Sequence, residues 1–146
     1  MGFDALQPKD WIAVYAAGLS TILGFVKGWE LFRDRFRFEV SYSFTGDEDE
    51  GNRIFIRNLA GKPIILTYWD LLYCKGYGPF RTYEGICSPD YYSGDTQIGA
   101  HSTLTLTFCE EDYFDWSHKV LKDRRIFIRL RFAGRGEYTR LVYAGS

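Results

Sequence analysis

A nearly charge-free segment between Trp11 and Trp29 constrains the fold of this chain more than any other feature. Its sequence is WIAVYAAGLSTILGFVKGW. As a helix rising about 1.5 Å per residue it spans roughly 27 Å, close to the hydrocarbon thickness of a bilayer. Tryptophan is favoured at membrane interfaces, where its ring lies in the apolar zone and its N–H stays hydrated. The segment therefore predicts a membrane-spanning helix with a tryptophan at each end.

Two other interpretations of this segment stay open. A helix that is apolar on all sides can be buried in a soluble core, and an apolar N-terminal segment can be a cleaved signal peptide. The uncharged run stops at Lys27, just short of the usual length for spanning, although a lysine near the end of a span can extend to the headgroups. The leader MGFDALQPKD is not basic, and no good A-x-A cleavage site follows it. The spanning helix is the preferred interpretation.

Small residues recur at every fourth position of the segment and share one face of the expected helix. They are Ala16, Ser20, Gly24 and Gly28, and the last two form a GxxxG motif. In lipid, such a stripe lets two helix backbones approach closely. We expect the helix to self-associate through this face and the protein to be a homo-oligomer.

The charges that flank the segment predict its orientation. Lys9 is the only basic residue before it, whereas Lys27, Arg33, Arg35 and Arg37 lie at or after its end. Because basic flanks face the cytoplasm, we expect a single pass through the inner membrane, with the N-terminus outside and the later residues in the cytoplasm. The residues expected at the membrane interfaces are Trp11, Lys27, Trp29, Arg33 and Arg35.

The sequence predicts a leader at residues 1–10, a transmembrane helix and basic neck at 11–35, and one domain at 36–146. This last part, about 110 residues long, is enough for an ordinary domain. Aromatic residues make up 18% of the chain and only four prolines occur, a composition that favours β-structure. Three cysteines do not make a closed disulfide framework, which fits a reducing compartment.

Alternation of apolar and polar residues with period two predicts several half-buried strands. The expected strands are 36–44, 52–58, 64–73, 102–108, 125–132 and 137–143. Residues 76–95 are expected to be irregular, 112–122 to form a short helix and 133–136 a hairpin turn. The expected fold is mainly β: a single N-terminal membrane helix followed by an Ig-like antiparallel β-sandwich with one short inserted helix.

Three stretches carry a resemblance: IFIRNLAGKPIILTYWDL at 54–71, IGAHSTLTLTF at 98–108 and IFIRLRFAGRGEYTRLVY at 126–143. With them the chain resembles a broad group of uncharacterised bacterial proteins that carry one N-terminal membrane helix, a short arginine-rich neck and a cytoplasmic Ig-like β-sandwich. The layout is also similar to that of small membrane effectors in phage-defence operons. The resemblance implies the fold and adds little about activity, because its motifs are structural.

No catalytic motif is found in the sequence, and we expect neither an enzyme nor a cofactor. A nucleophile–base pair of Cys109 and His118 and a zinc site built on the three cysteines were both considered. Neither has a characteristic spacing, and cysteines acting as small core residues explain the pattern better. General nucleic-acid binding is not expected, because the net charge is only −1.

A segment rich in tyrosine and glycine is the first candidate binding feature. Its key residues are Tyr77, Arg81, Tyr83, Tyr91 and Tyr92. Tyrosine among glycine and serine is typical of adaptable recognition loops, and long loops are often functional. The alternative is that these tyrosines fill the open end of the sandwich or contact another subunit.

The second candidate is a pair of Arg-aromatic-Arg patterns on outward strand faces. One comprises Arg53, Phe55 and Arg57, and the other Arg125, Phe127 and Arg129, with Arg131 beyond. Arginine beside an exposed aromatic ring suits a flat anionic ligand such as a nucleotide. It equally suits anionic lipid headgroups or charged cross-strand pairs and subunit contacts.

Two functional hypotheses follow from these features. In the first, the β-sandwich binds a ligand or partner and controls an assembly of membrane helices, as an effector or a channel-like protein. In the second, the helix is a simple tether and the sandwich is a protein-interaction module without pore activity.

Overall fold

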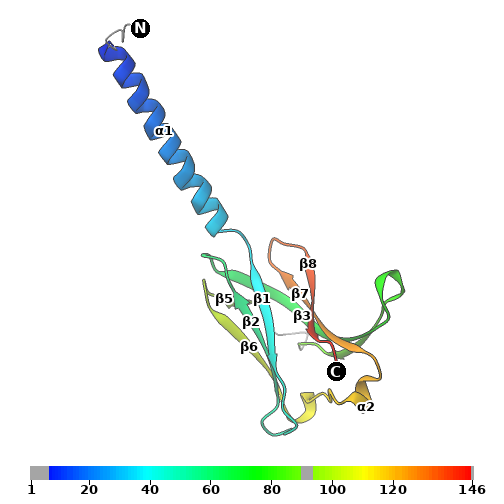
Figure 1. Ribbon diagram of the computed structural model, residues 1–146. Helices are drawn as coiled ribbons and strands as arrows, with labels where there is room; N and C mark the ends of the chain where they lie inside the picture. The colour runs from blue at the N-terminus through cyan, green and yellow to red at the C-terminus, as the bar shows by residue number, and fades with distance from the viewer. Residues whose placement is uncertain (1–6, 90–93, 146) are drawn as a thin grey trace. The chain divides into compact units, whose positions relative to one another are not determined.

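The computed structural model describes residues 7–89 and 94–145. The chain divides into two compact units, residues 1–35 and 36–146. The first unit contains the helix α1 (Pro8–Arg33), and the second contains every strand of the described residues (Figure 1).

Helix α1 is 26 residues long and begins at Pro8, whose fixed φ and missing N–H suit the first helical position. The Asp10 carboxylate accepts a hydrogen bond from the Gln7 backbone N–H at 3.0 Å, which satisfies a donor at the helix start. No residue of α1 is buried. By length and composition it is the one helix of the described residues that can cross a membrane.

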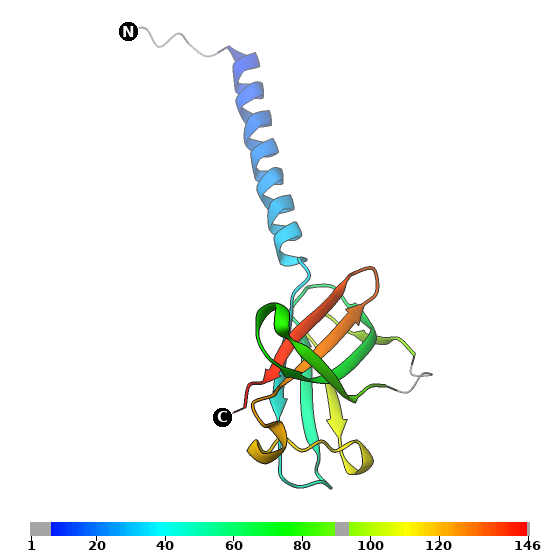
Figure 2. The same cartoon turned by 90° about the vertical axis from the view of Figure 1, so that its right-hand side faces the viewer.

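The second unit is a sandwich of two antiparallel sheets, so the mainly β fold with a single long N-terminal helix is confirmed. The first sheet has the order β1 (Phe38–Ser43), β2 (Asn52–Asn58) and β6 (Thr103–Phe108). The second has the order β4 (Thr82–Cys87), β3 (Ile64–Lys75), β7 (Arg125–Phe132) and β8 (Glu137–Tyr143), with β5 (Thr96–Ile98) on β3. In Figure 2 the second sheet faces the viewer and the first sheet lies behind it.

The core lies between the inner faces of the two sheets. Its fully buried aliphatic side chains are Ile54, Ile56, Leu71, Ile126, Ile128 and Leu130. Rings also join the sheets: the centroids of Trp69 on β3 and Phe108 on β6 lie 5.5 Å apart. The predicted alternation of β2 and β7 is therefore confirmed on their inner faces.

The helix predicted at 112–122 is wrong in its extent. The 3-10 turn Glu110–Asp112 comes first, and α2 (His118–Leu121) has only four residues. Phe114 is buried and Trp116 packs against the core. Residues two apart reach the same side in extended chain but not in a helix. Packing of these two rings therefore overrides the helical pattern.

The irregular segment predicted at 76–95 is also partly wrong, because Thr82–Cys87 forms β4. This strand pairs with β3 on one side only, and its first four residues are exposed. An exposed edge strand has no buried face to impose apolar alternation. The period-two pattern was therefore absent where the strand exists.

Two buried asparagines fix the ends of β2. Asn52 and Asn58 are both 0% exposed and point into the sandwich. The Asn52 side chain donates to the Phe114 carbonyl at 2.8 Å and accepts from the Thr45 N–H at 3.0 Å. Each asparagine therefore holds backbone groups that sheet pairing leaves without partners.

Candidate functional site

Five of the predicted binding residues meet on the outer face of the second sheet. We call them the aromatic–arginine cluster: Tyr77, Arg81, Tyr83, Arg125 and Phe127. They come from β4, β7 and the connection between β3 and β4. Phe127 is opposite Leu72 in the strand register, and both side chains are buried although they face outward. The cluster therefore surrounds a buried ring, Phe127, on the outer side of the sheet.

Phe127 corrects one prediction, since the pattern placed it as an exposed aromatic ring. It is only 7% exposed. The Tyr83 ring packs edge-on against it with centroids 6.4 Å apart. The guanidinium groups of Arg81 and Arg125 lie 5.9 and 5.4 Å from its centroid. Phe127 therefore serves as the base of the cluster and not as a free stacking platform.

Arg125 fastens the β3–β4 connection onto this base. Its Nη2 donates to the Gly76 carbonyl at 2.6 Å, and its guanidinium carbon lies 4.4 Å from the centroid of the Tyr77 ring. A charged hydrogen bond and a cation–π contact each favour one fixed geometry. The connection is therefore a held structure and not a loose loop.

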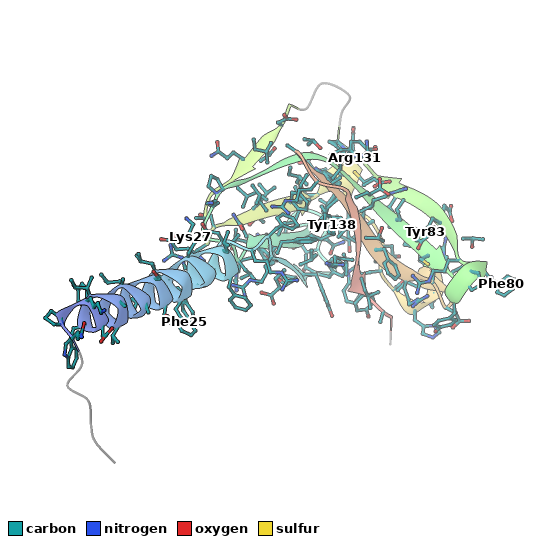
Figure 3. The ribbon with its side chains drawn as sticks, turned by 90° about the horizontal axis from the view of Figure 1, so that it is seen from above. Phe25, Lys27, Phe80, Tyr83, Arg131 and Tyr138 are labelled. Carbon is teal, nitrogen blue, oxygen red and sulfur yellow. The ribbon has the colours of Figure 1, made fainter. Side chains whose placement is uncertain are left out.

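The tip of this connection leaves two aromatic rings exposed. Tyr77 is 75% exposed and Phe80 84% exposed, and Figure 3 shows Phe80 at the free end of the hairpin. Gly76 makes the turn possible, because it has φ +90° and a Cβ there would lie 2.5 Å from the Phe80 carbonyl oxygen. We call residues 76–81 the hairpin tip.

A cavity of about 200 Å³ opens beside the hairpin tip. Aromatic, basic and acidic side chains line it. They include Tyr77, Trp116, His118, Asp123, Arg124, Arg125 and Tyr143. Asp123 of the lining and the preceding residue, Lys122, both have positive φ. Its size suits a small group or a partner side chain better than a whole nucleotide.

The arginines beside this site are largely engaged within the domain. Arg124 donates to the Glu84 carboxylate at 2.7 Å and to the Val120 carbonyl at 2.6 Å. Arg129 makes a bidentate pair with Asp70, at 2.9 and 2.7 Å. The hydrogen bonds that Arg129 donates to Asp70 raise the pKa of Arg129 above its ordinary value. These contacts favour cross-strand pairing over an open anion site.

The other Arg-aromatic-Arg pattern lies on a different sheet. Arg53, Phe55 and Arg57 share the outer face of β2, opposite Thr107, Thr105 and Thr103 of β6. The guanidinium groups of Arg53 and Arg57 are each 3.9 Å from a glutamate oxygen, in Glu50 and Glu39. The two predicted patterns therefore do not form one binding surface.

The predicted self-association stripe is open. A Cβ at Gly24 or Gly28 would meet nothing within 4 Å. Trp11 and Trp29, predicted at the membrane interfaces, are 61% and 70% exposed. Lys27 pairs with Glu30 at 3.1 Å, and Figure 3 shows Lys27 and Phe25 projecting from the helix. Arg33 is the last residue of α1 and Arg35 follows it.

The sequence prediction and the structure differ at several candidate positions. Tyr91 and Tyr92 lie outside the described residues. Phe80 was not singled out, although an aromatic residue directly after the Gly78-Pro79 turn was its signal. Trp116, His118 and Tyr143 had no local signal, because they meet only in the folded sandwich. Within residues 7–89 and 94–145, no group of three His, Cys, Asp or Glu side chains is placed to hold a metal ion.

No protein-family model matches the chain, and no curated protein matches it in sequence.

Proposed function

We propose that this protein is a single-pass membrane protein that self-associates through α1. Its β-sandwich, on the cytoplasmic side, binds a ligand or partner that controls the assembly of the helices. The observation that carries the proposal is that α1 is apolar yet has no buried residue. In this proposal the lipid bilayer and further copies of the chain cover α1.

The exposed side chains of α1 support a bilayer and not a soluble core as its surroundings. Ile12, Phe25 and Trp29 are 70%, 76% and 70% exposed. At about 100° per residue Phe25 and Trp29 share one face. Ile12 and Leu31, the latter 69% exposed, each point more than about 100° away from Phe25 and about 100° from each other. A soluble amphipathic helix has one apolar face, so apolar residues on several sides favour lipid.

The small-residue stripe supports assembly within the bilayer. Open space at Gly24 and Gly28 lets a second helix approach closely, and close packing is the main attraction between helices in lipid. Flanking basic residues at Arg33 and Arg35 support a cytoplasmic sandwich. An assembling effector of this layout is expected to arrest growth when it is overproduced in bacteria.

The first experiment is expression of the full chain in bacteria, followed by fractionation and mass determination after detergent extraction. We expect an oligomer in the membrane fraction. The double variant Gly24→Leu/Gly28→Leu should become a monomer that stays in the membrane and no longer arrests growth.

Gly18→Leu is the matched control. It makes the same change in the same helix, also at an open position, but roughly 140° from the centre of the stripe. It should leave the oligomer intact. A soluble wild-type monomer would overturn the proposal, and a double variant that stays oligomeric would overturn the packing face.

The hairpin tip is the proposed contact surface of the sandwich. Phe80 and Tyr77 offer apolar area that the domain itself leaves uncovered, and Arg125 holds them in place. Pre-ordering reduces the entropy lost on binding. Because the nearby arginines are engaged, a partner with an apolar contact is favoured over an anionic small molecule or nucleotide.

The same exposed tip favours a second candidate, a tethered interaction module without pore activity. It needs α1 only as an anchor. Replacing residues 11–29 with an unrelated apolar spanning helix separates the two: a tether keeps its function, whereas an assembling effector loses it.

A further inference from the structure

The free sheet edges of the sandwich are not protected equally. A strand at an edge exposes unpaired N–H and C=O groups, and natural proteins cover such edges with charges, prolines or very short strands. β1 carries Glu39, β4 carries Glu84, and β8 carries Glu137 and Arg140. β5 has only three residues. β6, with the sequence TLTLTF, has no charge, no proline and no glycine.

The outer edge of β6 has no partner in the described part of the chain. β2 pairs with β6 on one side, and no strand follows on the other. Within residues 7–89 and 94–145, none of the backbone hydrogen bonds outside the sheet ladders involves residues 103–108. Thr103, Thr105 and Thr107 are exposed on the outer face. Among the described residues, therefore, no strand occupies this edge, and a further strand can pair with it.

We propose that β6 pairs antiparallel with β6 of a second copy of this chain. The twofold axis passes through Thr105, which faces its own counterpart. Thr103 then faces Thr107, and Leu104 faces Leu106, so threonines meet on the outer face and leucines on the inner face. Pairs of threonine across strands are favourable. The two three-stranded sheets join into one continuous sheet of twice that width.

This pairing rests on the proposed membrane assembly, because the edge alone is small. Six residues extend only about 20 Å, and the interface buries less than the ~1,000 Å² that a stable complex in solution needs. Helices that already associate raise the local concentration of the attached domains, so a weak contact becomes populated. The edge then couples neighbouring sandwiches in the assembly.

Cysteine cross-linking of the full chain in membranes tests the pairing. Thr105→Cys should give a disulfide-linked dimer under mild oxidation. Ser41→Cys is the matched control, because Ser41, Phe55 and Thr105 form one row across the outer face of the same sheet, with Ser41 on the opposite edge. Random collisions link both variants equally, whereas edge pairing favours Thr105→Cys on the order of tenfold. The unsubstituted chain, treated in the same way, measures the background of links that form through the native cysteines.

Equal cross-linking of the two variants, no link from Thr105→Cys, or a link to a different protein would each overturn the inference.

A charge exchange at Thr105 gives a second test. Thr105→Lys or Thr105→Glu alone places like charges opposite each other across the paired β6 strands and should separate the two copies. The readout is the disulfide that forms between copies of a chain that also carries Thr103→Cys and Thr107→Cys. This disulfide should be lost when either charge variant is added. Co-expression of the two charge variants should restore it; no restoration would count against the register.

The failure of this inference can be told apart from the failure of the proposed function. If only the edge pairing is wrong, the wild-type chain is still a membrane oligomer that Gly24→Leu/Gly28→Leu disrupts, and Thr105→Lys has no effect. If the membrane assembly is wrong, the wild-type chain itself is monomeric after extraction.

Discussion

The Arg125 guanidinium lies over the Tyr77 ring at 4.4 Å and donates to the neighbouring Gly76 carbonyl at 2.6 Å. One side chain of a central strand therefore holds a connection 49 residues away in sequence. This relationship converts a glycine-containing turn into a defined surface. The order of the hairpin tip accordingly depends on Arg125 as well as on the turn at Gly76.

Arg125→Ala should therefore loosen the hairpin tip without unfolding the sandwich. We expect a loss of about 1–2 kcal/mol of unfolding free energy, from one charged hydrogen bond and the cation–π contacts with Tyr77 and Phe127. Amide hydrogen exchange at residues 76–81 should become faster. Arg131→Ala is the control, because Arg131 lies on the same strand but pairs with Glu137 and has a 59% exposed side chain. Equal exchange in both variants would contradict the bracing role.

Asn58→Ala should be among the most destabilising single changes in the domain. The Asn58 amide donates to the carbonyls of Lys62 and Gly99 at 2.8 and 3.0 Å, and its oxygen accepts from the Ala60 N–H at 2.9 Å. Removal leaves these groups without partners in a buried place, at a cost of about 2–4 kcal/mol. Urea unfolding measures it. Thr105→Ala, at an exposed position, should change stability by less than about 0.5 kcal/mol.

Tyr73 should make the domain less stable at alkaline pH. Burial raises the pKa of Tyr73 above its ordinary value of 10.0, partly opposed by Arg124, and its hydroxyl donates to the Asp115 carbonyl at 3.0 Å. The folded state thus keeps a proton that the unfolded state has released. This stabilisation is complete below pH 10 and is lost as the pH rises through the folded-state pKa.

Tyr73→Phe tests this pH dependence. Unfolding free energies from pH 8 to 11 should fall less steeply with pH in Tyr73→Phe than in the unsubstituted domain. Tyr68→Phe, which removes a hydroxyl from a 41% exposed tyrosine, is the control. A slope that stays the same in Tyr73→Phe would show that other groups cause the alkaline loss.

Local periodicity predicted the inner faces of the sheets but not the outer surface. Ile54 and Ile56 alternate with polar residues, and a strand with one buried face requires that pattern. Phe127 alternates in the same way and was predicted to be exposed. It is buried because Arg81 of the hairpin tip and Tyr83 of β4 pack against it, and these contacts join β7 to residues far away in sequence. No pattern within one strand contains this information.

The candidate site was predictable in its composition and not in its contacts. Tyr77 and Arg81 were recognisable because tyrosine and arginine among glycines are typical of recognition segments. The engagement of Arg129 with Asp70 was not recognisable, because the two are paired only through the register of β3 and β7. The short α2 shows the same limit, since the burial of Phe114 decided its length.

The orientation of the chain can be checked directly. With Arg33 and Arg35 after α1, a fluorescent protein fused to the C-terminus should fluoresce in bacteria, and alkaline phosphatase fused there should be inactive. Arg33→Gln/Arg35→Gln should weaken this bias. The reverse pattern in the unsubstituted chain would place the sandwich outside the cytoplasm, where the proposed control by an internal ligand or partner does not apply.

Phe80 gives the sharpest separation of binding from folding. It is 84% exposed, whereas Phe108 is 2% exposed. The same substitution should therefore reduce the unfolding free energy strongly at Phe108 and very little at Phe80. Phe108→Ala should cost about 3–5 kcal/mol of unfolding free energy, and Phe80→Ala less than about 0.5 kcal/mol. If the hairpin tip contacts a partner, Phe80→Ala should nevertheless abolish the growth arrest expected on overproduction while the membrane oligomer persists. A Phe80→Ala protein that is as stable, as oligomeric and as growth-arresting as the unsubstituted chain would remove the tip from the mechanism.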